Sequence, residues 1–268
     1  LDQGFHPLAY AAVRYGAAAL IFAAITLALE GSLRIGRGEA PLAVGCVVVL
    51  FANQVCFIYA LDLTTATTTA LLFGTLPIWT GLFARISGVE HMSLRFWVAA
   101  VVSFAGVVLV AAGSGGKLST SLAGDALAVG GAATWAAYSV GIAPLMRRYS
   151  PFRLSAIFLL SVTVPLFVVG APSIADQEWD LGWLAWLGFA FAVLGPLVVT
   201  NLMWFTAIDR VGPSRASPFA NLQPFLAAII ALVILSEHIT RLEVAGGLVL
   251  AAGILVAPRT RPPMPDAD

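Results

Sequence analysis

The sequence predicts an all-α membrane protein, a bundle of transmembrane helices built as an inverted repeat. Of the 268 residues, 60% are hydrophobic and only 10% are charged, and the mean hydropathy is +0.94. A water-soluble domain needs a far more charged surface, whereas lipid accepts apolar side chains on every outer face. Two further observations lead to this fold class: a series of nine long apolar segments and an internal repeat.

Nine apolar segments are long enough to form transmembrane helices, because a helix needs about 20 mostly apolar residues to cross the hydrocarbon. In chain order they are 7–29, 41–61, 65–86, 93–112, 124–146, 151–171, 182–206, 212–235 and 242–258. The links between them, such as 30–40, 87–92 and 173–181, are too short to hold a soluble domain. The tail 259–268 is rich in proline and charge, which predicts a disordered segment.

The distribution of Lys and Arg predicts which face of the membrane is cytoplasmic. If the nine segments alternate in direction, one face carries Arg34, Arg37, Arg85, Arg95, Arg147, Arg148, Arg153, Arg210, Arg215, Arg259 and Arg261. The other face carries only Lys117 and Arg241, and Arg14 lies inside the first segment. Cytoplasmic loops hold an excess of Lys and Arg, so we expect a cytoplasmic C-terminus and an external residue 1.

Residues that are rare in membrane helices recur at a constant offset of 147 residues. The pairs are Asp62 with Asp209, Pro77 with Pro224, Glu90 with Glu237, His91 with His238, Ser93 with Thr240 and Gly106 with Gly253. An offset of 144 also aligns Pro7 with Pro151, each at the start of a segment. The recurrence of several rare residues at one constant offset indicates a duplicated structural unit.

The two copies are expected to have opposite orientations, because five segments, an odd number, separate repeat partners. The turn at 90–91 is then cytoplasmic and the turn at 237–238 external. We predict a first repeat at 1–113, a linker at 114–123, a second repeat at 124–258 and a cytoplasmic tail at 259–268. The second repeat has five segments and the first has four. We therefore expect that one helix is missing before residue 1, a Leu, and that the intact protein has ten; a native nine-helix protein is the alternative.

Several short motifs resemble the EamA module of the drug/metabolite transporter superfamily. They are Ala60-Leu61 with the Thr-rich stretch 64–69, Pro77 and the Glu90 loop, Trp135-Ala136-Ala137-Tyr138, and the series Ala207, Ser217, Pro224, Glu237, Gly246 and Gly253. Their order and doubled spacing cover essentially the whole chain. The resemblance implies a ten-helix exporter or exchanger fold with a central cavity lined by both halves. Substrates of that family include amino acids, nucleotide sugars and drugs, and its first helix contributes to the cavity.

Polar and aromatic side chains within the segments are expected to face the bundle interior, because hydrocarbon penalises them. A substrate-binding set that supplies amide groups and aromatic faces would comprise Asn53, Gln54, Trp79, Trp135, Tyr138, Asn201, Trp204, Asn221 and Gln223. The alternative is that these groups only tie helices together, through hydrogen bonds worth about 0.6–2 kcal/mol each. Trp and Tyr also belong to interfacial belts.

Pro77 and Pro224 lie within segments at matching positions, where proline frees a backbone carbonyl and bends the helix. They are predicted to be hinges, with a static kink as the alternative. Arg14 is expected to have a gating or structural role, and pairing with an anionic substrate group is the alternative. Cys46 and Cys56 are interpreted as packing residues. The two Glu-His pairs, 90–91 and 237–238, would lie on opposite membrane faces and so could not form one metal site. We therefore expect no metal and no cofactor.

These features favour a secondary transporter, an exporter or exchanger that moves a small polar or amphipathic metabolite, such as an amino acid or drug-like compound, by alternating access. No Asp or Glu lies in the middle of a segment, which favours facilitated diffusion or exchange over proton coupling. A channel or facilitator is the alternative, although no filter loop is evident. An intramembrane enzyme is disfavoured, since no nucleophile–base pair or metal motif lies at membrane depth.

The partners predicted from the sequence are a small-molecule substrate and the lipid bilayer. No basic groove indicates nucleic acid, and a homodimer is compatible with the sequence. We expect a multi-pass protein of the cell membrane, in a bacterial inner membrane.

Overall fold

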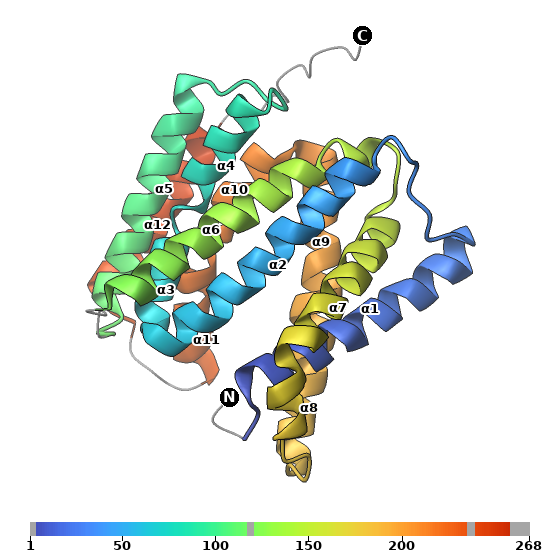
Figure 1. The fold of residues 1–268 in the computed structure, drawn as a ribbon. Helices are drawn as coiled ribbons and strands as arrows, with labels where there is room; N and C mark the ends of the chain where they lie inside the picture. The colour runs from blue at the N-terminus through green and yellow to red at the C-terminus, as the bar shows by residue number, and fades with distance from the viewer. Residues whose placement is uncertain (1–3, 117–120, 235–238, 258–268) are drawn as a thin grey trace. The chain divides into compact units, whose positions relative to one another are not determined.

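The computed structural model describes residues 4–116, 121–234 and 239–257, and its regular elements are all helical within these ranges (Figure 1). In order they are α1 (Pro7–Glu30), α2 (Ala40–Leu63), α3 (Ala66–Phe73), α4 (Leu76–Ile86), α5 (Leu94–Gly113), α6 (Leu122–Ile142), η1 (Leu145–Arg147), α7 (Pro151–Ala175), α8 (Trp183–Ala192), η2 (Val193–Thr200), α9 (Asn201–Val211), α10 (Pro213–Ala220), α11 (Gln223–Ile234) and α12 (Arg241–Val256). The predicted disordered tail at 259–268, residues 117–120 of the predicted linker and the second Glu-His pair, 237–238, lie outside the described residues.

Helix starts follow from proline and hydroxyl residues in the sequence. Pro7, Pro151 and Pro213 each open a helix, where the missing N–H costs nothing. Thr240 begins α12 with a capping box, since its hydroxyl accepts from the Glu243 N–H while the Glu243 carboxylate accepts from the Thr240 N–H. In α5, α6 and α7 the N-cap side chain alone accepts from a backbone N–H of the first turn, and these N-caps are Ser93, Ser121 and Ser150.

Seven helical stretches of the described chain are long and apolar enough to cross a membrane, when adjoining helices are counted as one span. They are Pro7–Glu30, Ala40–Leu63, Ala66–Ile86, Leu94–Gly113, Leu122–Arg147, Pro151–Ala175 and Trp183–Val211. The remaining two expected spans correspond to α10 with α11 and to the 16-residue α12. Each of the nine predicted segments therefore has a helical counterpart.

Two spans are interrupted at equivalent positions. The span 66–86 breaks at Gly74 and Thr75 between α3 and α4, and the span 213–234 breaks at Asn221 and Leu222 between α10 and α11. These breaks are 147 residues apart, and each lies directly before a helix with proline at its second position. Pro77 and Pro224 thus follow helix breaks rather than bending continuous helices.

The span 183–211 contains a π-helical segment that the sequence analysis did not predict. Segment η2 contains Pro196 and separates α8 from α9. The equivalent stretch of α2, 147 residues earlier, is ordinary α-helix. Runs of π-helix are rare and usually occur at functional positions.

The helices form two compact units, and each unit draws on both predicted repeats. Unit 1 comprises residues 1–51 and 144–210, and unit 2 comprises 52–143 and 211–268. Helix α2 contributes its first half to unit 1 and its second half to unit 2.

In unit 1, α1 and its repeat partner α7 pack along their length in opposite directions (Figure 1). A Cβ placed on Gly170, near the end of α7, would lie 3.2 Å from the Leu8 carbonyl oxygen, near the start of α1. At the other end, the last residue of α1, Glu30, bonds Arg153 near the start of α7. This antiparallel pairing is the geometry of an inverted repeat.

In unit 2, the repeat partners α5 and α12 pack with direct backbone contact (Figure 1). A Cβ on Gly106 would lie 2.9 Å from the Gly246 carbonyl oxygen, and a Cβ on Gly253 would lie 3.1 Å from the Ala99 carbonyl oxygen. The repeat offset of 147 residues relates Gly106 to Gly253 and Ala99 to Gly246, so the two contacts are equivalent. A local two-fold axis therefore relates α5 and α12. Small residues permit this close approach, and Val107 with Leu250 forms the adjoining core.

Candidate functional site

A buried pair of amides on α2 connects this helix to α6 within unit 2. Asn53 is 3% exposed, and its Nδ2 donates to the Gly131 carbonyl at 2.8 Å and to Thr134 Oγ1 at 3.4 Å. Gln54, 5% exposed, donates from Nε2 to Asn53 Oδ1 at 2.9 Å.

Two aromatic side chains on α6, Trp135 and Tyr138, lie one and two turns beyond the Gly131 carbonyl that Asn53 binds. The rings of Trp135 and Tyr138 are 5.7 Å apart between centroids and tilted by 48°. Trp135 is half-buried and Tyr138 is buried. Asn53, Gln54 and Trp135 therefore come together on facing turns of two helices, and they combine amide groups with an aromatic face.

The interruption of the span 66–86 creates a polar junction inside unit 2. The Ile78 N–H bonds the Thr75 carbonyl, so the Gly74 carbonyl loses the helical partner it would otherwise have. Asn221 Nδ2 donates to that Gly74 oxygen at 3.0 Å and to Ser103 Oγ at 2.9 Å. Because Asn221 and Gly74 are 147 residues apart, the contact joins repeat-equivalent positions of the two interrupted spans.

Two other expected binding residues of unit 2, Trp79 and Gln223, are placed apart from these polar contacts. Trp79 on α4 stacks on Phe83, with ring centroids 6.0 Å apart. Gln223 is exposed at the first position of α11, and Pro224 follows it. Ser217, on α10 one turn before Asn221, is buried, and its hydroxyl donates to the Ser214 carbonyl at 3.3 Å.

In unit 1, Asn201 lies directly after the π-helical segment and ties α9 to α7. Its Nδ2 donates to Ser155 Oγ at 2.9 Å, and Ser155 is fully buried. Trp204 lies one turn further along α9 and is half-buried. Arg14 also belongs to this unit, on α1, with its guanidinium over the ring of Tyr10.

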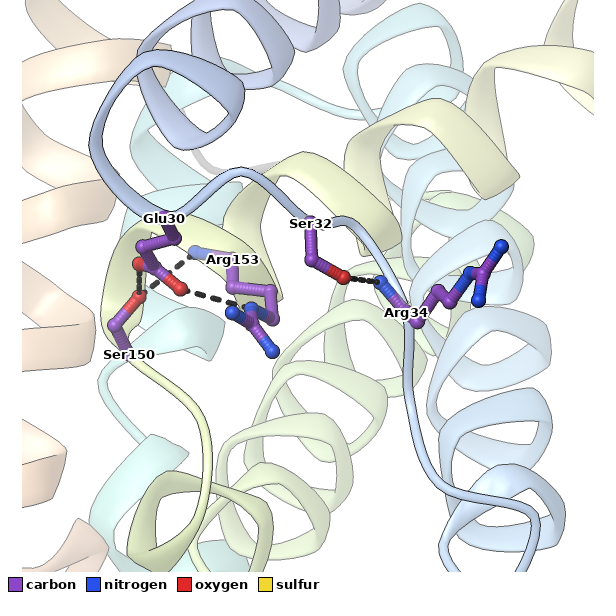
Figure 2. A network of polar contacts seen from close by, with 5 residues as sticks. All are labelled: Glu30, Ser32, Arg34, Ser150 and Arg153. Atoms are coloured by element: carbon purple, nitrogen blue, oxygen red, sulfur yellow. Dashed lines mark hydrogen bonds and ion pairs between the residues drawn. The ribbon is translucent and has the colours of Figure 1, made fainter.

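A charged cluster joins the end of α1 and its following loop to the start of α7 (Figure 2). Glu30 accepts from Arg153 Nε at 2.8 Å and from the Ser150 hydroxyl. Glu39 pairs with Arg148, and the Tyr149 hydroxyl accepts from the Gly36 N–H at 2.8 Å. The cluster fastens one end of the antiparallel pair α1–α7.

The chain matches a family model described as the EamA-like transporter family over residues 2–112 and again over 122–257. The chain belongs to the EamA-like transporter family. It is therefore a membrane transporter, in agreement with its apolar helical spans. The family predicted from the sequence motifs is confirmed.

Relatives of this EamA-like chain include the uncharacterized transporter YyaM of Bacillus subtilis, which is 25% identical over 94% of this chain and 85% of its own length. The uncharacterized inner membrane transporter YedA of Escherichia coli is 26% identical over 95% of this chain and 82% of its own length. A solved crystal structure has the same fold, with a TM-score of 0.81 over 94% of this chain and 88% of the other, at 19% identity.

Several groups that shape these EamA-like polar contacts were not singled out from the sequence. They are the hydroxyls of Ser103, Thr134 and Ser155 and the carbonyls of Gly74 and Gly131. Nothing in their local sequence distinguishes them from other small residues of apolar helices. Pro196, within a predicted span, was the available signal for the irregular segment η2.

Proposed function

We propose that this protein is a secondary transporter, an exporter or exchanger, that moves a small polar or amphipathic metabolite by alternating access. The observation that carries the proposal is the antiparallel packing of repeat partners, α1 with α7 and α5 with α12. When two copies have opposite orientations, an exchange of their conformations converts a state open to one side into a state open to the other. A channel needs no such symmetry.

The half-buried aromatic rings and buried amides support a substrate with both polar and apolar parts. The proposed substrate-binding residues of unit 2 include Asn53 and Gln54 on α2 and Trp135 and Tyr138 on α6, and those of unit 1 are Asn201 and Trp204 on α9. Trp79, Asn221 and Gln223 complete the proposed set. The interruptions before Pro77 and Pro224 would let each span bend at its break, since fewer backbone hydrogen bonds hold the helix there.

Exchange or facilitated diffusion is the mode of transport that we favour over proton coupling. In the described helices the carboxylates lie near helix ends: Glu30, Asp62, Asp125, Asp209 and Glu243. Proton-coupled carriers commonly place a titratable group at membrane depth. An ionophore that collapses the proton gradient should therefore leave substrate flux unchanged in proteoliposomes, and clear inhibition would refute this mode.

The proposed location is a bacterial inner membrane, with the C-terminus in the cytoplasm. This orientation rests on the eleven basic residues assigned to one face. It places the cluster of Glu30, Ser150 and Arg153 on the cytoplasmic side. Reporter fusions to the C-terminus and to the link at 114–123 should show opposite locations.

Counterflow in proteoliposomes tests the transport mechanism directly. Metabolites that raise the unfolding temperature of the purified protein would first be selected, because a ligand stabilises the state that binds it. Uptake of a labelled hit should saturate and should accelerate when the same compound is preloaded inside. Linear, non-saturable conductance would instead indicate a channel.

A further inference from the structure

Arg14 is placed unusually deep for a basic residue. It is the eighth residue of α1, about 10 Å along the helix from Pro7 at a rise of 1.5 Å per residue. Every other basic residue in the described helices lies within three residues of a helix end. An ionisable side chain inside a membrane span is costly and usually has a functional partner.

Within the described chain, Arg14 has no hydrogen bond and no ion pair. Its Nε atom is buried without a hydrogen-bond partner. The two ion pairs found among the described residues use other basic side chains, Arg148 and Arg153. Among the described residues, the charge of Arg14 therefore has no anionic partner.

Two tyrosines of the same helix lie within cation–π distance of the guanidinium. Its Cζ atom lies 5.1 Å from the ring centroid of Tyr10 and 5.8 Å from that of Tyr15. Such cation–π contacts stabilise the positive charge, but they do not provide hydrogen-bond acceptors for the guanidinium N–H donors. A planar donor edge matches a carboxylate, which can accept two parallel hydrogen bonds.

An aromatic cluster adjoins this position. The ring of Tyr10 lies 5.3 Å from Phe5 and 6.0 Å from Phe189, and Trp186 lies 5.7 Å from Phe189, all between centroids. The ring contacts place Tyr10 level with the last turn of α8, and α1 also packs against η2. The π-helical segment therefore begins at about the depth of Arg14.

We propose that Arg14 is an anion subsite that binds the carboxylate of an organic acid, whose apolar or aromatic part contacts the neighbouring rings. This inference rests on the proposed transport function and adds the charge of the substrate to it. A lipid phosphate is a second source of an anion, so the test separates the two.

The test uses the purified full chain in phosphatidylcholine nanodiscs and matched probes that differ only in charge. The pairs are benzoate and benzamide, phenylacetate and phenylacetamide, and indole-3-acetate and indole-3-acetamide, each titrated against the unfolding temperature. At least one carboxylate should stabilise the protein where its amide does not. Arg14→Gln should weaken that binding by about tenfold to a hundredfold, the usual effect of losing a charge-assisted hydrogen bond.

Two further variants keep the result interpretable. Arg14→Lys retains the charge without the planar donor edge, so it should bind the carboxylate more weakly than the wild type and better than Arg14→Gln. Arg34→Gln removes an exposed arginine whose side chain points away from the Glu30 cluster in Figure 2, and it should bind like the wild type. If Arg14→Gln does not fold, the amide pairs and the lysine variant still decide the question.

The proposal would be overturned if no carboxylate raised the unfolding temperature more than its matched amide, or if Arg14→Gln bound the carboxylate as tightly as the wild type. It would also be overturned if added phosphatidylglycerol were the only anion that stabilised the protein through Arg14. Flux measurements separate this inference from the transport function. Arg14-dependent carboxylate binding without any counterflow would contradict transport alone. Counterflow of metabolites without a carboxylate preference would contradict the anion subsite alone.

Discussion

Replacing Asn221 by alanine should destabilise the protein by removing two buried hydrogen bonds at once. Asn221 is 2% exposed and donates to the Gly74 carbonyl at 3.0 Å and to Ser103 Oγ at 2.9 Å. A hydrogen bond between membrane helices contributes about 0.6–2 kcal/mol, so Asn221→Ala should lower the free energy of unfolding by about 1–4 kcal/mol. The upper part of this range applies because the Gly74 carbonyl, already without its helical partner, is then left unsatisfied.

Ser103→Ala provides the matched control. It removes the hydroxyl acceptor but leaves the bond between Asn221 and the Gly74 carbonyl in place. It should therefore cost less than half as much as Asn221→Ala. In the double variant the two effects should not add, since both substitutions remove the same contact.

The assay is reversible unfolding in mixed micelles, followed by counterflow on the same preparations. A loss below about 0.5 kcal/mol for Asn221→Ala would refute the reasoning, since it falls below the smallest contribution expected from one such bond. A normal stability combined with a higher KM would assign Asn221 to substrate binding instead of helix contact.

Three further outcomes follow from the packing. Gly106→Ala should lower the free energy of unfolding by about 1–3 kcal/mol, because the added methyl group overpacks the contact between α5 and α12. Gly45→Ala is the control: no atom lies within 4 Å of the added Cβ, so it should be neutral or stabilising in the same unfolding assay. Asn53→Ala should abolish the ligand-induced rise in unfolding temperature; an unchanged rise would exclude it from the site. A double-mutant cycle on Glu30→Gln and Arg153→Gln should give a coupling energy of about 0.5–2 kcal/mol that falls with added salt, and zero coupling would show that the pair does not fasten α1 to α7.

The interrupted spans show how far the sequence could predict the site. Both spans are interrupted just before Pro77 and Pro224, since proline cannot donate the helical hydrogen bond, and the role of these prolines as hinges stays a prediction. The partner of the freed Gly74 carbonyl was not predictable, since Asn221 is close to it only after the two spans have packed. The role of Asn221 in binding substrate stays a prediction.

The conformation of segment η2, by contrast, was not predictable from the sequence. Val193–Thr200 is a π-helix, while the equivalent stretch of α2 is α-helical, although both are strongly apolar. Pro196 indicates an irregularity there, but a proline alone does not say whether the helix kinks, breaks or widens.

The membrane class, the helical spans, the family and the repeat were determined by the sequence itself. Hydrophobicity is a property of composition and length, and a duplication preserves rare residues such as Pro77 and Pro224 at a fixed offset. Only the tertiary structure decided that each compact unit combines helices from both repeats, with α1 against α7 and α5 against α12. The physical reason is that lipid-facing and helix-facing apolar residues are chemically alike, so helix partners depend on close contacts between small residues and on buried hydrogen bonds that form only when the chain packs.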